Sequence, residues 1–218
     1  MAMTMQHTHT IPVWDPAVRA GHWALVVAFA AAYLTGEGEQ EGLTGVVHVW
    51  AGYAVGIIVA LRVLWGLIGP TYARFADFVF GPVKVLRYLL DLVLGRAHRY
   101  AGHSPAGGAM VLALLLCLMG TVVTGLVAYG DQGKGPLASG TLGVVAQSHA
   151  ESDRSQRDNP AGRRPERAES MVGELHGTLA NLTLALVVLH LFGVGLASVV
   201  HRENLVRAMV DGRKRALD

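Results

Sequence analysis

Four histidines lie inside long stretches that contain no Asp, Glu, Lys or Arg. They are His22, His48, His176 and His190. An ionisable side chain within an apolar, membrane-spanning segment is costly, and it usually faces the interior of a helix bundle and serves a function. Because imidazole can bind a metal or relay a proton, these histidines are the first candidates for chemistry in the sequence.

The spacing of these histidines predicts two pairs. His176 and His190 are 14 residues apart. This is close to four helical turns, so they share one helix face and lie about 21 Å apart along its axis. Because consecutive spans cross in opposite directions, His176 is expected at the depth of His48. His190 is likewise expected at the depth of His22. Each facing pair can supply the two axial ligands of one flat macrocycle, such as haem.

Other uses of these histidines remain open on spacing alone. A proton-coupled or ion-coupled carrier would use them as a relay without haem. A single intramembrane histidine can also be a hydrogen-bonded packing residue. Zinc is not expected, because no Cys or carboxylate joins the four histidines to complete a site.

The distribution of charge predicts the elements that position these histidines. Charged residues make up only 16% of the 218 residues, against about 25% in soluble domains. They are absent from residues 20–36, 42–61, 100–130 and 175–201. A bilayer core needs roughly 20 apolar residues per helix. We therefore expect an all-α membrane protein, a four-transmembrane-helix bundle that forms a single domain over residues 1–218, with spans at residues 18–36, 43–68, 104–130 and 172–200.

The connections between the spans predict an orientation. Lys and Arg are frequent between the second and third spans and after His201. Basic loops stay on the cytoplasmic side, so both termini are expected in the cytoplasm. Residues 82–95 have an amphipathic pattern, which predicts a cytoplasmic interfacial helix. Residues 131–171 are expected to form an outer loop, although this loop carries six basic residues.

A glycine and three arginines extend the candidate site. Gly52 follows His48 by four residues, so it leaves the same helix face bare for a porphyrin edge or for close helix packing. Arg19, Arg62 and Arg74 are expected near the cytoplasmic side and are candidate partners for haem propionates. Interfacial anchoring explains each arginine equally well.

The remaining polar residues near the spans receive simpler interpretations. His98 and His103 accompany basic residues and are expected to be solvated at the interface. His201 opens the charged tail and is not expected to be a ligand. Asn181 is expected to hydrogen-bond a neighbouring group.

Several functions are not expected. The net charge is only +2, and there is no basic arm, so we expect no nucleic-acid partner. The single Cys117 excludes an intrachain disulfide and covalent haem attachment through Cys-x-x-Cys-His. There is no Gly-rich nucleotide loop and no iron–sulfur cysteine set.

Several segments resemble the prokaryotic cytochrome b561 family. The fourth predicted span, "ELHGTLANLTLALVVLH", followed by "HRENLVRAM", closely resembles the family's fourth span. "VWDPAVRAGHW" resembles its entry to the first span, and "VVHVWAGYAVG" the start of its second. "LRVLWGLIGPTYARFADFV" resembles the end of the second span and the loop after it. The likeness covers most of the chain but not the outer loop.

The resemblance implies two non-covalent b-type haems in a protein of the bacterial inner membrane. By position, His48 and His176 would bind the outer haem, and His22 and His190 the cytoplasmic one. The expected function is electron transfer between the quinone pool and a periplasmic redox partner such as a c-type cytochrome. Membrane lipid, a bound quinone and a second copy of the chain are further expected partners.

Two functional alternatives accompany this expectation. One is a quinone-reducing or quinol-oxidising membrane oxidoreductase that acts on a small oxidant or radical. The other is a haem-free proton-coupled transporter with a histidine relay. An electron carrier or oxidoreductase subunit is favoured over a stand-alone enzyme.

Overall fold

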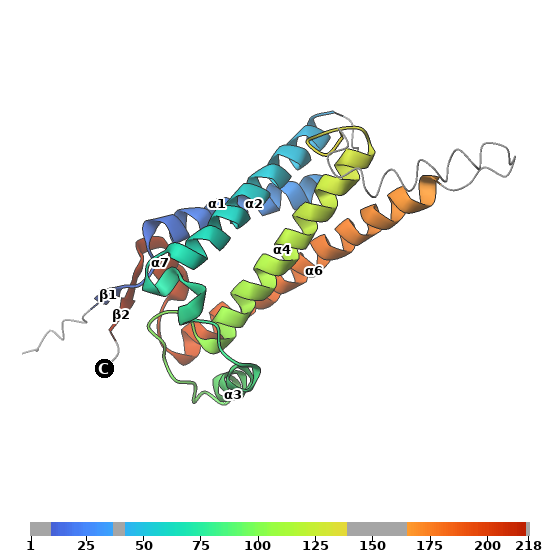
Figure 1. Ribbon diagram of the computed structural model, residues 1–218. Helices are drawn as coiled ribbons and strands as arrows, with labels where there is room; N and C mark the ends of the chain where they lie inside the picture. Colours follow the sequence, from blue (N-terminus) through green and yellow to red (C-terminus); the bar gives the residue numbers. More distant parts are fainter. Residues whose placement is uncertain (1–9, 37–41, 139–164, 217–218) are drawn as a thin grey trace, which may run out of the picture.

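The computed structural model describes residues 10–36, 42–138 and 165–216, and it is predominantly helical (Figure 1). The elements in chain order are β1 (Thr10–Pro12), α1 (Pro16–Gly36), α2 (Leu43–Ile68), the short 3-10 helices η1 (Thr71–Ala73) and η2 (Phe75–Asp77), α3 (Pro82–Val93), α4 (Pro105–Asp131), α6 (Pro165–Val200), α7 (Leu205–Asp211) and β2 (Arg213–Arg215).

Four helices are long and apolar enough to cross a membrane. They are α1, α2, α4 and the Met171–Val200 part of α6. Many of their large apolar side chains are exposed, as Val27, Leu116 and Phe192 are by 69%, 74% and 68%. Such exposure is unfavourable in water and is removed when lipid covers the helices. The expected four-helix membrane architecture is therefore confirmed at this level.

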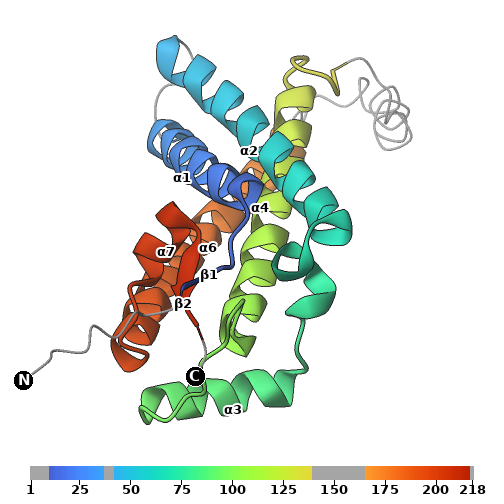
Figure 2. The ribbon, with the colours of Figure 1, turned by 90° about the vertical axis from the view of Figure 1, so that its left-hand side faces the viewer.

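The four long helices form two antiparallel pairs (Figures 1 and 2). Helix α1 packs along α2, and α4 packs along α6. The pairs meet mainly through α2 and α4, where Val55, Val59 and Leu118 form a buried apolar cluster. Among the spans, the described part of α6 packs closely on α4 alone. The helix pairs therefore face each other with little direct packing of α6 against α1 or α2.

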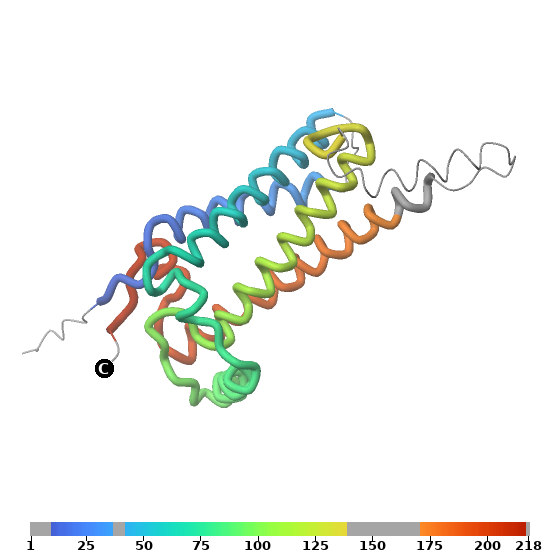
Figure 3. The backbone as a smooth tube through the Cα atoms, in the orientation of Figure 1, coloured from blue at the N-terminus to red at the C-terminus, as the bar shows by residue number. Residues whose placement is uncertain are grey.

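Both described ends of the chain lie at one end of the bundle, as the tube in Figure 3 shows. Strands β1 and β2 pair antiparallel there, with Ile11 opposite Lys214, and α3 and α7 lie at the same end (Figure 2). Lys214 Nζ donates hydrogen bonds of 3.1, 3.1 and 3.4 Å to the carbonyls of Tyr100, Ala101 and Gly102. We call this the terminal end, and the opposite one the far end.

Local sequence explains where several helices begin. Helix α4 starts with Pro105 after Ser104, whose hydroxyl accepts a hydrogen bond from the Gly107 amide, a standard helix cap. Helix α3 similarly begins with Pro82 and ends at Val93, within the predicted residues 82–95.

Helix α6 starts earlier than its apolar sequence suggests. It begins at Pro165, inside the segment 131–171 that we expected to form a loop. Proline is compatible with the first turn of a helix, and a helix that leaves the apolar layer can continue with polar residues. The rest of that predicted loop, residues 139–164, lies outside the described residues.

Candidate functional site

His48 of α2 and His176 of α6 face each other between the two helix pairs. Their ring centroids are 6.0 Å apart, and the ring planes are 82° apart. Two imidazoles that bind one metal ion from opposite sides, each through a nitrogen about 2 Å from the metal, have centroids about 6 Å apart. The separation of these rings therefore fits a pair of axial ligands.

Hydrogen bonds orient both rings of this pair. His48 Nδ1 lies 2.9 Å from the carbonyl oxygen of Ala32 on α1. His176 Nδ1 lies 2.9 Å from the carbonyl oxygen of Thr121 on α4. A carbonyl can only accept a hydrogen bond, so Nδ1 carries the proton in each ring and Nε2 keeps a free lone pair. This is the usual state of a metal-binding histidine.

A cavity of about 390 Å³ adjoins these rings in the far half of the bundle. This volume lies in the range of roughly 300–1,000 Å³ that is typical of small-molecule sites. Gly52 and Gly177 line the cavity, and a Cβ atom at either position would meet nothing within 4 Å. At the same cavity, the Tyr33 hydroxyl donates a 2.8 Å hydrogen bond to Asn181 Oδ1. The structure thus provides open space beside the histidine pair and the expected partner for Asn181.

The second predicted pair lies in the half of the bundle near the terminal end. His22 of α1 and His190 of α6 are close enough to interact electrostatically, and the His22 ring lies edge-on to Trp23 at 5.3 Å. His22 Nδ1 is buried and has no hydrogen-bond partner in the described part of the chain. A buried ring nitrogen without a partner indicates an environment that a ligand or water completes.

The donor sets of both pairs fit haem better than a bare metal ion. Across residues 10–36, 42–138 and 171–216, no group of three or more His, Cys, Asp or Glu side chains could hold a metal ion. Two imidazoles alone leave a metal with too few protein ligands. Haem supplies the remaining ligands from its own macrocycle, so a histidine pair is sufficient to hold it.

Arg19 and Arg62 each contact a backbone carbonyl. Arg19 donates to the carbonyl of Val210, and its Nε is buried without a partner among the described residues. Arg62 Nη1 donates to the Ala73 carbonyl at 3.2 Å, and its guanidinium lies 5.3 Å from the Phe75 ring centroid.

Arg74 has a different environment. Its Nε lies 3.2 Å from Asp77 Oδ2 in an ion pair whose side chains are 45% and 34% exposed. Arg74 therefore already has a carboxylate partner within its own connection, at the protein surface.

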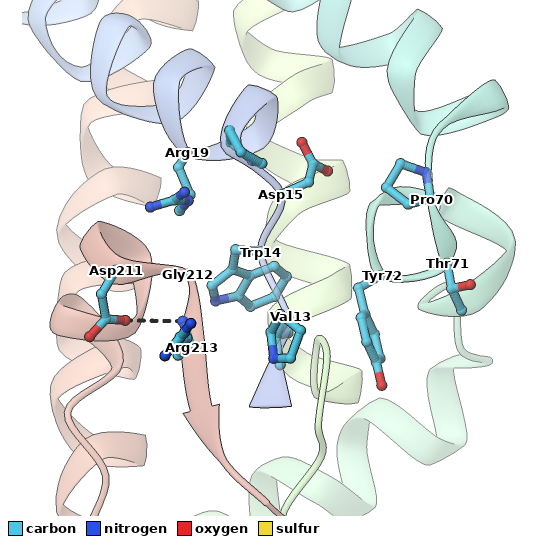
Figure 4. A pocket seen from close by; sticks show the side chains of 12 residues that line it. Val13, Trp14, Asp15, Arg19, Pro70, Thr71, Tyr72, Asp211, Gly212 and Arg213 are labelled. Carbon is cyan, nitrogen blue, oxygen red and sulfur yellow. Dashed lines mark hydrogen bonds between the residues drawn. The ribbon is translucent and has the colours of Figure 1, made fainter. Parts of the chain in front are cut away.

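A surface pocket of about 500 Å³ opens at the terminal end beside Arg19 (Figure 4). Trp14 and Asp15 line it on one side and Tyr72 on another, and Asp211 contributes a further carboxylate. The pocket has charges of both signs and contains none of the four candidate histidines. It is thus distinct from the cavity between the helix pairs.

His103 is more enclosed than the sequence suggested. Its ring lies 4.3 Å from Phe78 and 4.6 Å from Trp14, centroid to centroid, and its Nδ1 is buried. Burial, with a smaller contribution from the charges of Arg62 and Lys214, lowers the pKa of His103 to about 3. The expectation of a solvated interfacial histidine was therefore wrong, because Trp14, which follows β1, and Phe78, which follows η2, pack against its ring.

His201 stands apart from the candidate pairs. Its Nε2 lies 3.1 Å from the Tyr88 hydroxyl of α3. Because His201 directly follows α6, this contact joins the end of α6 to α3. Burial lowers the pKa of His201, and the charges of Arg99 and Lys214 add to this effect. This contact gives His201 a role in helix packing.

The groups that sequence reasoning missed are mainly backbone atoms. The carbonyls of Ala32 and Thr121 orient His48 and His176, which we call the far pair, yet every residue carries a carbonyl. Tyr33 was also missed, because nothing in the apolar first span indicates that its hydroxyl would meet Asn181 of α6.

Comparison with known proteins identifies the family to which this chain belongs. A family model described as prokaryotic cytochrome b561 matches residues 13–212. Neither curated proteins nor solved structures gave a match. The matched segment contains all four candidate histidines and all four membrane-spanning helices. The chain therefore belongs to the prokaryotic cytochrome b561 family, whose membership implies a membrane protein that transfers electrons through b-type haem.

Proposed function

We propose that this protein carries electrons across the bacterial inner membrane through two bis-histidine b-type haems. The observation that carries the proposal is the far pair. Its rings stand at the separation of axial ligands, and each has its Nδ1 proton donated to a carbonyl. A proton relay needs no such matched arrangement of two imidazoles around an adjoining cavity.

In this proposal the four histidines act as ligands in two layers. His48 and His176 hold the haem nearer the far end, and His22 and His190 hold the haem nearer the terminal end. Bound haem supplies one-electron redox chemistry. The chain fixes the orientation of the imidazoles, excludes water with apolar helices, and with Gly52 keeps the cavity open.

Arginines at the terminal end are the proposed partners of the haem carboxylates. Of Arg19, Arg62 and Arg74, Arg19 best supports this role, because it follows the first turn of α1 and has a buried Nε without a described partner. A guanidinium can bind a carboxylate through two parallel hydrogen bonds.

We further propose that the terminal end faces the cytoplasm. The positive-inside rule supports this orientation, since α3, α7 and β2 all carry basic residues. Helix α3 also exposes Val83, Leu86 and Leu90 by 64%, 61% and 66%, while Tyr88 is buried. An exposed apolar face of this kind supports a position in the membrane interface.

The proposed electron path joins the quinone pool to a periplasmic redox protein such as a c-type cytochrome. An outer haem site between His48 and His176 would be the nearer of the two to such a partner. Quinone and a second copy of the chain are the other proposed partners.

A reduced-minus-oxidised visible spectrum of the purified protein tests the proposal. We expect the sharp bands of low-spin b-type haem and, by the pyridine haemochrome assay, two haems per chain. Addition of a reduced quinone analogue should reduce the haems, and an oxidised c-type cytochrome should then reoxidise them. Protein without haem bands would favour the transporter alternative. Steady turnover of quinol with a small oxidant alone would favour the oxidoreductase alternative.

A further inference from the structure

The two imidazoles of the far pair rest on the same backbone feature of two different helices. On α1, the Ala32 carbonyl accepts the hydrogen bond from His48 Nδ1 at 2.9 Å. Four residues later stands Gly36, where a Cβ atom would lie 3.3 Å from His48 Cε1. We call this carbonyl and the glycine four residues after it a glycine notch.

Helix α4 repeats the feature for the other ring. The Thr121 carbonyl accepts from His176 Nδ1 at 2.9 Å. Gly125 follows four residues later, and a Cβ atom there would lie 2.9 Å from His176 Cε1 and 3.2 Å from Nδ1. The second notch is therefore tighter than the first.

A threonine precedes the glycine in both notches. Thr35 Oγ1 donates to the carbonyls of Ala31 and Ala32 at 2.7 and 3.3 Å. Thr124 Oγ1 donates to the carbonyls of Gly120 and Thr121 at 2.8 and 3.1 Å. Such back-bonding often bends helices. The two notches thus share three features on unrelated stretches of helix.

Helix geometry explains why the glycine is needed. A helical carbonyl points along the axis toward the residue four positions later, whose side chain covers it. A ring from a neighbouring helix can reach that carbonyl only if the covering side chain is absent. Glycine at this position therefore opens a backbone acceptor that other residues would block.

We propose that the glycine notches at Gly36 and Gly125 are positioning elements that fix the tautomer and orientation of both far-pair ligands and thereby lower the reduction potential of the haem they hold. The inference rests on the proposed function, because it assigns these residues to the same site. Hydrogen bonding from Nδ1 makes the ligating nitrogen more basic. A more basic ligand stabilises the oxidised iron, so displacing the ring from its carbonyl raises the potential.

Single alanine substitutions at the notches test this inference. Gly125→Ala should weaken haem retention at the far pair by about 10- to 100-fold. It should also shift the midpoint potential of that haem upward and change its low-spin electron paramagnetic resonance signal. Gly36→Ala should shift the potential in the same direction but less, because its Cβ meets the ring at 3.3 Å rather than 2.9 Å. The haem of the other pair should keep its potential in both variants.

Gly120→Ala is the matched control, since it lies on the same helix and its Cβ would meet Leu179 Cδ1 at 3.2 Å instead of a histidine. Equal shifts in Gly120→Ala and Gly125→Ala would overturn the inference in favour of general helix packing. Unchanged far-haem potentials in folded Gly125→Ala and Gly36→Ala would also overturn it. Circular dichroism reports folding, and if Gly125→Ala does not fold, Gly36→Ala decides. A wild-type protein without haem would overturn the proposed function itself. If haem is bound but its midpoint potential does not change in the notch variants, only this inference is overturned.

Discussion

The two histidine pairs differ in how the polypeptide holds them. At the far pair, His48 and His176 each donate from Nδ1 to a carbonyl of a neighbouring helix. At the other pair, His22 Nδ1 is buried and has no partner within the described residues. The far pair is therefore arranged by the protein itself, whereas the ring of His22 depends on a ligand or water to complete its environment.

The two ends of the bundle also differ, in the cavity that one contains and in the polar contacts that hold the other together. The far half contains a cavity lined by apolar side chains and several polar ones, whereas the terminal end is held together by buried polar contacts. Lys214 binds three carbonyls, and Arg99 lies 3.5 Å from Glu203. The comparison indicates that one half is built to accept a cofactor and that the other also ties the chain ends together.

Replacing one ligand of each pair should give the largest effect. His176→Ala is expected to remove the far haem and His190→Ala the other, because each pair shares no ligand with its neighbour. The pyridine haemochrome assay should then find about half of the wild-type haem in each variant. His201→Ala is the control and should keep both haems, since its ring contacts Tyr88. Loss of both haems from a helical single variant would contradict two independent pairs.

These variants also allow the two pairs to be compared for haem retention. We expect haem to transfer to excess apomyoglobin about 10-fold faster from His176→Ala, which keeps the His22 pair, than from His190→Ala. The reason is that both rings of the far pair donate from Nδ1 to a carbonyl of a neighbouring helix, whereas His22 Nδ1 has no partner among the described residues. Equal transfer rates would show that the missing Nδ1 partner of His22 has no consequence for haem retention.

Acid should weaken the terminal end specifically. An unfolded histidine has a pKa near 6.5, whereas the pKa of His103 is lowered to about 3 by burial. The unfolded state therefore binds the extra proton between these values. The stability that neutral His103 contributes is complete above pH 6.5 and is lost as the pH falls toward 3. The loss should reach about 2 kcal/mol at pH 5.

Unfolding in mixed detergent micelles at several pH values measures this effect. His103→Leu should flatten the fall in stability between pH 7 and pH 5. The exposed His98 provides the control, and His98→Leu should retain the wild-type pH dependence. If His103→Leu were to unfold with the wild-type pH dependence, His103 would not be the responsible group.

Removing the buried ammonium at the terminal end should have a smaller effect. Lys214→Ala leaves the carbonyls of the 100–102 segment without their donor, which is expected to cost about 1–2 kcal/mol. Thermal unfolding measures the loss, and the exposed neighbour Arg213 gives the control Arg213→Ala, expected within about 0.5 kcal/mol of wild type. Haem content should stay unchanged in both, and haem loss in Lys214→Ala would couple the terminal end to the haem sites.

Much of the architecture was predictable because it depends on local composition. A stretch of about 20 residues without charge indicates a membrane span wherever it occurs. The predicted helix at residues 82–95 similarly followed from its amphipathic pattern. The start of α6 at Pro165 was not predicted, because a helix outside the apolar layer has no comparable signal.

The candidate site was predictable only in part. Intramembrane histidines stand out by type, and their spacing predicted which ones share a depth. The notches at Gly36 and Gly125 did not stand out, although each follows a threonine. The same dipeptide also occurs at positions 44 and 45, so it is not distinctive in the sequence.

Local sequence is enough to specify the membrane-spanning helices and to single out the four histidines, because the cost of placing charge or imidazole in lipid applies to each segment separately. The packing of the helices specifies which carbonyls orient His48 and His176, that Arg74 pairs with Asp77 and that His103 is enclosed. These outcomes depend on which helices lie side by side. Backbone carbonyls occur in every helix and glycines in each of the four long helices, and only the packing of neighbouring helices selects the ones that are used.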